Sequence, residues 1–61
     1  MRKGDFVKLS ELAIRQGIDN RRRGDKGIIL RFTARDNNPV IKWTKVKTPN
    51  EYNREFIEIL P

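Results

Sequence analysis

The sequence predicts an all-β domain over residues 1–61: a small five-stranded barrel with one long loop after the first strand. Four or five short apolar segments alternate with turn-forming residues, which is typical of a β-sandwich or β-barrel. A domain of about 60 residues buries only about 60% of the surface that its unfolded chain exposes, so the core has to be economical. A closed small barrel suits this length because closure leaves no exposed sheet edge.

The first predicted strand covers residues 5–9, where Val7 and Leu9 share one face by the two-residue period of a strand. Residues 10–20 form a long loop in which Ser10 is a good helix N-cap and Gly17 suits the position after a helix end. We therefore expect one or two helical turns in this loop. The sequence leaves open whether the loop projects towards a partner, so that shortening it changes binding but not stability, or folds back onto the core.

Residues 19–25 are polar and continue the loop. The clearest strand is 27–32, which is apolar on both faces and β-branched at Ile28 and Ile29, as expected for a bent strand buried on both sides. A turn over 34–39, rich in Asn and Asp, leads to a third strand at 40–43.

Residues 44–53 are predicted to hold a hairpin loop and one short strand near Val46 or Tyr52. A tight 3₁₀-type turn at 54–56 precedes the closing strand, 57–60. The predicted core consists of Val7, Leu9, Ile29, Leu30, Ile41, Trp43, Phe56 and Ile59.

The composition argues against catalysis. The chain has no cysteine and no histidine, which removes thiolate nucleophiles and the commonest general base and metal ligand. The acidic residues lie in turns, and their spacing matches no calcium loop. We therefore expect no catalytic residue, no metal, no cofactor and no small-molecule substrate.

No apolar run approaches the roughly 20 residues of a membrane span, and no signal-peptide core follows Met1. The expectation is a soluble, cytoplasmic chain that does not bind membranes and is a whole gene product.

The positive charge is concentrated in one half of the chain. The net charge is +6, and residues 1–35 carry ten Lys and Arg against four Asp and Glu, whereas residues 36–61 carry four against four. A localised positive field attracts nucleic acids or acidic proteins, although it also simply promotes solubility.

Two groups of residues are candidates for binding. The segment RRRGDKGIIL (21–30) sets three arginines before two glycines, and guanidinium groups suit phosphate and carboxylate recognition; the alternative is a solvated turn. Trp43 is either a core residue or a base-stacking platform. The candidate binding residues are Arg15, Arg21, Arg22, Arg23, Lys26, Lys42, Lys45 and Lys47. Exchange of the three consecutive arginines for serine is expected to leave thermal stability almost unchanged.

The segments RKGDFVKL and RRRGDKGIIL together resemble the KOW motif of SH3-like barrels, in which a strand leads to a basic glycine turn and a second apolar strand. The matching residues are Gly4, Asp5, Val7, Leu9, Gly24, Gly27, Ile29 and Leu30. The segments PVIKW and EFIEIL resemble the rest of such a barrel. The loop over 10–20 is longer than in KOW motifs and is similar to that of two accessory barrels, the photosystem I stromal subunit and the ferredoxin–thioredoxin reductase variable chain.

The resemblance to KOW motifs implies a binding module that contacts RNA or nucleic-acid-bound machinery. The favoured hypothesis is therefore a nucleic-acid or ribonucleoprotein partner, either RNA or DNA, held through a basic face. The resemblance to accessory barrels implies the alternative, a docking module for an acidic protein.

Overall fold

The computed structural model describes all 61 residues as one five-stranded antiparallel sheet with one short helix. Along the chain the elements are β1 (Phe6–Leu9), α1 (Glu11–Arg15), η1 (Asn20–Arg22), β2 (Gly27–Phe32), β3 (Pro39–Trp43), β4 (Asn50–Glu51), η2 (Arg54–Phe56) and β5 (Ile57–Ile59), where η denotes a 3₁₀ helix. The strand order is β4-β3-β2-β1-β5, and every neighbouring pair is antiparallel.

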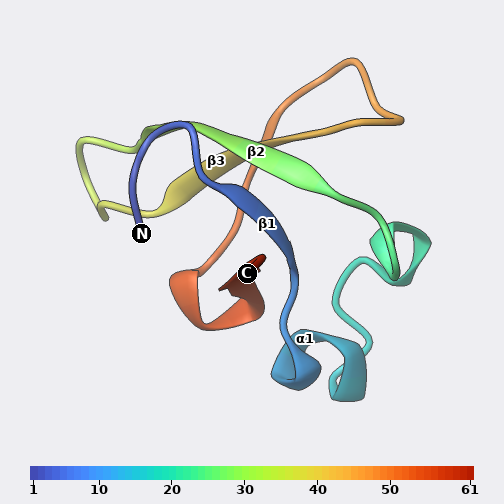
Figure 1. Ribbon diagram of the computed structural model, residues 1–61. Coiled ribbons are helices and arrows are strands. Elements are labelled where there is room, and N and C mark those ends of the chain that lie inside the picture. Colours follow the sequence, from blue (N-terminus) through green and yellow to red (C-terminus); the bar gives the residue numbers. More distant parts are fainter.

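The mostly-β prediction is confirmed, with the short helix in the predicted place after the first strand. The predicted closure is not observed, because no ladder joins the edge strands β4 and β5. In Figure 1, β2 and β3 cross the upper part of the molecule side by side, and α1 lies below them.

The core lies on one face of the sheet. Its fully or nearly fully buried side chains include the predicted Val7, Leu9, Ile29, Ile41 and Trp43. It also contains residues that the sequence did not single out, namely Ala13, Tyr52 and Ile57. Val40 is buried too, but it is next to Ile41 in β3 and lies outside this cluster. Phe56 is half-buried and packs against this core.

Two predicted core residues are exposed. The register between β2 and β3 shifts between Ile29 and Arg31, so Leu30 sits in a β-bulge without a partner and its side chain is 41% exposed. Ile59 pairs with the buried Val7, but it ends the edge strand β5, where no further strand covers it, and it is 43% exposed. The prediction that strand 27–32 is buried on both faces is therefore wrong at Leu30.

The long loop folds back onto the core and does not project. Ser10 caps α1, because its Oγ accepts a hydrogen bond from the Ala13 N–H at 3.2 Å, while the Ser10 hydroxyl donates to the Glu55 carbonyl at 2.8 Å. The Ser10 N–H also donates to the Phe56 carbonyl at 2.9 Å, so the start of α1 is tied to η2. Since Ala13 is fully buried, shortening this loop is expected to destabilise the fold.

The end of α1 is fixed by its backbone. The Gly17 N–H donates to the Ile14 carbonyl at 3.2 Å and the Ile18 N–H donates to the Ala13 carbonyl at 2.9 Å, the double hydrogen bond of a Schellman motif. Gly17 adopts φ +71°, which confirms the role predicted for this glycine. The chain then turns back towards the sheet, and Ile18 packs against the core.

Gly27 is required for packing rather than for turning. A Cβ at this position would lie 2.6 Å from Ile41 Cγ2 and 2.9 Å from Trp43 Cε3, both closer than van der Waals contact. Gly24, in contrast, has open space but φ +82°, so it supplies the turn. The two glycines of the segment 21–30 thus have different functions in the fold.

We expect Gly27→Ala to lower the free energy of unfolding by about 1–3 kcal/mol, the usual cost of overpacking a core. Urea denaturation measures this change. The loss should be smaller in an Ile41→Ala background, where one of the two clashing side chains is shortened. A Gly27→Ala variant as stable as the parent would contradict the close packing described above.

Candidate nucleic-acid interface

The sheet face opposite the core carries an exposed aromatic side chain. Phe6 of β1 pairs with Ile28 of β2, which in turn pairs with Lys42 of β3, so these three residues form one row across the sheet. They alternate along their strands with buried residues and therefore point away from the core. Phe6 is 53% exposed, and Ile28 and Lys42 are half-buried.

A lysine lies against this aromatic ring. The Lys26 Nζ is 5.1 Å from the centroid of the Phe6 ring, within the range of a cation–π interaction. Neither Lys26 nor Lys42 forms an ion pair, and the Lys42 ammonium instead donates to the Trp43 carbonyl at 2.8 Å. We call Phe6, Lys26, Ile28 and Lys42 the outer face; it has one exposed ring and two cations without a carboxylate partner.

The three consecutive arginines do not form a single cluster. The Arg22 Nη1 lies 3.0 Å from Asp25 Oδ2, and both side chains are largely buried, at 18% and 9% exposure. Lys45 Nζ lies 3.6 Å from the other oxygen of Asp25, so Asp25 holds two of the predicted binding residues. One carboxylate thus pairs with both cations, of which Arg22 is largely buried and Lys45 is exposed.

The other two arginines of the triplet are exposed and lie at different places. The Arg21 side chain is 89% exposed, and its Nε lies 3.9 Å from the Asp19 carboxylate. Arg23 forms no ion pair and lines a groove beside β1 that Arg21 does not reach.

The remaining predicted binding residues are also separate from one another. Arg15 is paired with Glu11 at 2.7 Å across one turn of α1, and Lys47 is exposed in the β3–β4 loop without an ion pair. Of the eight predicted residues, the structure therefore brings only Lys26 and Lys42 together on the outer face.

The sequence reasoning did not identify Phe6 as a site residue. The available signal was the alternation in the first strand, because placing Val7 and Leu9 in the core places Phe6 and Lys8 on the opposite face. Lys8 lies 3.5 Å from Glu58 and is neutralised by it.

Trp43 is a core residue and is not available for stacking. It is fully buried, and its indole N–H donates to the Tyr52 hydroxyl at 2.9 Å. The two rings meet edge to face at 90°, with centroids 5.7 Å apart. The structure thus decides between the two roles that the sequence left open.

The Tyr52 hydroxyl donates in turn to the Asp19 carboxylate. Burial, and then this hydrogen bond to a negative acceptor, raise the pKa of Tyr52 to about 12, although the N–H donated by Trp43 acts in the opposite direction. Asp19 itself adopts φ +47°, a left-handed conformation that this contact helps to hold.

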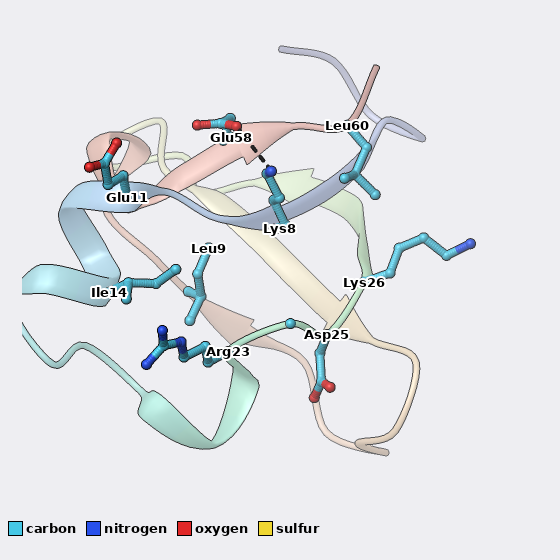
Figure 2. Close-up of a pocket in the computed structure, with 10 residues that line it drawn as sticks. Lys8, Leu9, Glu11, Ile14, Arg23, Asp25, Lys26, Glu58 and Leu60 are labelled. Atoms are coloured by element: carbon cyan, nitrogen blue, oxygen red, sulfur yellow. Dashed lines mark ion pairs between the residues drawn. The ribbon is translucent and has the colours of Figure 1, made fainter.

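A groove of about 540 Å³ adjoins the outer face (Figure 2). It lies between β1, α1 and the segment that enters β2, and both Lys8 and Lys26 line it. We call it the β1 groove. A second hollow of about 110 Å³ beside Arg21 is much smaller.

No group of three or more His, Cys, Asp and Glu side chains is placed to hold a metal ion. No helix of the structure is both long enough and apolar enough to cross a membrane. The chain matches no protein-family model, no curated protein and no solved structure.

The Arg22–Asp25 pair changes the expectation for the arginine triplet. Removing one partner of a buried ion pair costs about 3–5 kcal/mol, and we expect Arg22→Ser to lie near the lower end because Lys45 still faces Asp25. Arg21→Ser and Arg23→Ser serve as matched controls and should leave the melting temperature nearly unchanged, since both side chains are exposed. Equal melting temperatures for all three variants would contradict a structural role for Arg22.

The buried Tyr52 predicts a stability loss at alkaline pH. With a folded pKa near 12 and an ordinary value of 10.0, the unfolded chain loses this proton first, so the contribution is complete below pH 10 and is lost as pH rises towards 12. We expect the free energy of unfolding to fall by at most about 1.4 kcal/mol per pH unit from this group. Tyr52→Phe should remove that part of the slope, and identical slopes in the two proteins would refute the assignment.

Proposed function

We propose that the chain is a small non-catalytic binding module that holds single-stranded nucleic acid on the outer face. The observation that carries this proposal is the exposed Phe6 ring with the Lys26 ammonium 5.1 Å from its centroid. Proteins that bind single strands combine aromatic rings, on which bases stack, with cations that follow the phosphates. The outer face has both components.

The charge on this face supports an anionic partner. Lys26 and Lys42 have no carboxylate partner, so their positive charge is not neutralised within the protein. The nearby carboxylate of Glu58 lies 3.5 Å from the Lys8 ammonium, which neutralises its charge. A single strand exposes its bases for stacking, whereas a duplex keeps them paired, so an exposed ring on the sheet face favours the single strand.

The architecture is compatible with the resemblance seen in the sequence. Five antiparallel strands, a long segment between the first two and a 3₁₀ turn before the last strand fit an SH3-like domain with a KOW-like first half. Gly4 and Gly24 both adopt positive φ, as turn glycines of such a motif would. The KOW-like assignment belongs to this proposal and supports RNA or DNA as the partner.

Two substitutions of Phe6 test the proposal. Phe6→Leu keeps an apolar side chain but removes the π-face, and we expect it to weaken binding of an eight-nucleotide oligothymidylate by about 1–3 kcal/mol, the usual worth of one stacked base. Phe6→Tyr retains the ring and should bind like the parent. Fluorescence anisotropy at two salt concentrations measures the affinities, with a log–log slope of about −0.7 per phosphate contacted.

Because Phe6 is half-exposed, both variants should keep the parental melting temperature, which separates lost binding from lost folding. Failure of the parent to bind any single strand at moderate salt would overturn the proposal. It would favour the alternative, in which the partner is an acidic protein. Equal affinities of Phe6→Leu and the parent would show that the ring is not the platform.

A further inference from the structure

The β1 groove contains charged residues of both signs, but their charges are not equally available. Its three carboxylates all have cationic partners: Lys8 faces Glu58 at 3.5 Å, and Arg15 faces Glu11 at 2.7 Å. The third, Asp25, lies 3.0 Å from Arg22 and 3.6 Å from Lys45. In Figure 2 the Asp25 side chain points away from Lys8 and Leu60, which line the opposite side of the groove.

Two cations of the groove have no carboxylate partner. Arg23 and Lys26 both line it and form no ion pair. In Figure 2 they lie at opposite ends, with Arg23 beside Ile14 and Leu9 and Lys26 extending away from them. The groove therefore offers positive charge at both ends, which suits a ligand with several linked anionic groups better than a single ion.

The groove is continuous with the outer face, because Lys26 belongs to both. Its ammonium lies over the Phe6 ring, while its side chain lines the groove. A strand whose base stacks on Phe6 has its backbone next to Lys26, and the groove is the hollow into which that backbone can continue. Two apolar side chains of the groove are partly exposed, Ile14 and Leu60, and they suit the carbon atoms of sugars.

We propose that the β1 groove is a second subsite that holds the sugar of the nucleotide next to the base stacked on Phe6 and the phosphate on the far side of that sugar, with Arg23 as the phosphate ligand. The guanidinium of Arg23 is suited to this contact because its planar fork matches two phosphate oxygens. This inference rests on the proposed function, and it adds a minimum ligand of two consecutive nucleotides and a defined direction along the sheet.

The ligands for the test are trimers with one thymine at either the 5′ or the 3′ end and abasic sugars elsewhere, so that the single base fixes the register on Phe6. In each trimer the phosphate farther from the thymine is either charged or replaced by a neutral methylphosphonate. Affinities are measured by NMR titration of the ¹⁵N-labelled protein. The proteins are the parent, Arg23→Ser and the charge-matched control Arg35→Ser, whose exposed arginine lies in the β2–β3 loop and forms no ion pair.

For one of the two trimer directions, we expect the neutral linkage to weaken binding to the parent by about three- to fivefold, the range for an exposed charged contact. Arg23→Ser should bind the charged trimer as weakly as the parent binds the neutral one, and should not distinguish the two ligands. Arg35→Ser should behave like the parent. All three proteins should have similar melting temperatures, since both arginines are exposed.

The results that overturn the inference differ from those that overturn the proposed function. If the parent binds oligothymidylate in a Phe6-dependent manner but both linkages give equal affinity in both directions, the subsite is refuted and the outer face remains. If the parent binds no single strand, both are refuted. If inorganic phosphate alone shifts the amides of the groove at lower concentration than the trimers do, the groove is a site for free anions and not for a strand.

Discussion

The structure depends on one series of hydrogen bonds that runs from the buried Trp43 indole through the Tyr52 hydroxyl to the partly buried Asp19 carboxylate. These three residues come from β3, from the segment after β4 and from the loop between α1 and β2. A buried indole N–H or hydroxyl is costly unless it is hydrogen-bonded, so each partner stabilises the position of the next. These hydrogen bonds hold the long loop against the core and place residues 23–26 beside β1. That segment forms one wall of the β1 groove.

The same arrangement determines which face of the sheet is available to a partner. The core takes Trp43 and every second residue of the central strands, and α1 adds Ala13 to it. The opposite residues, Phe6 and Ile28 among them, are left partly in contact with water. The ring that packs in the core, Trp43, and the ring that is exposed on the outer face, Phe6, are therefore different residues.

Local signals in the sequence were sufficient for most of the elements, although β4 lies at Asn50–Glu51 and η1 was predicted only as part of a loop. Strand 27–32, the turn at 54–56 and the cap at Ser10 are where the sequence predicts them, because each depends on neighbours within a few residues. The bulge at Leu30 and the separation of the arginines could not be predicted in this way. Of the three consecutive arginines, only Arg22 pairs with Asp25. The same carboxylate also pairs with Lys45, which is 20 residues away along the chain. Such choices depend on tertiary geometry.

The measurement that tests the central claim most directly is a map of the backbone amide shifts of the ¹⁵N-labelled protein during titration with oligothymidylate. We predict that the largest changes occur at Phe6, Lys26 and Ile28, which are adjacent on the outer face although they are far apart in sequence. Residues of the β3–β4 loop, such as Lys47, should change little. Changes centred on that loop, or no changes at all, would contradict the account.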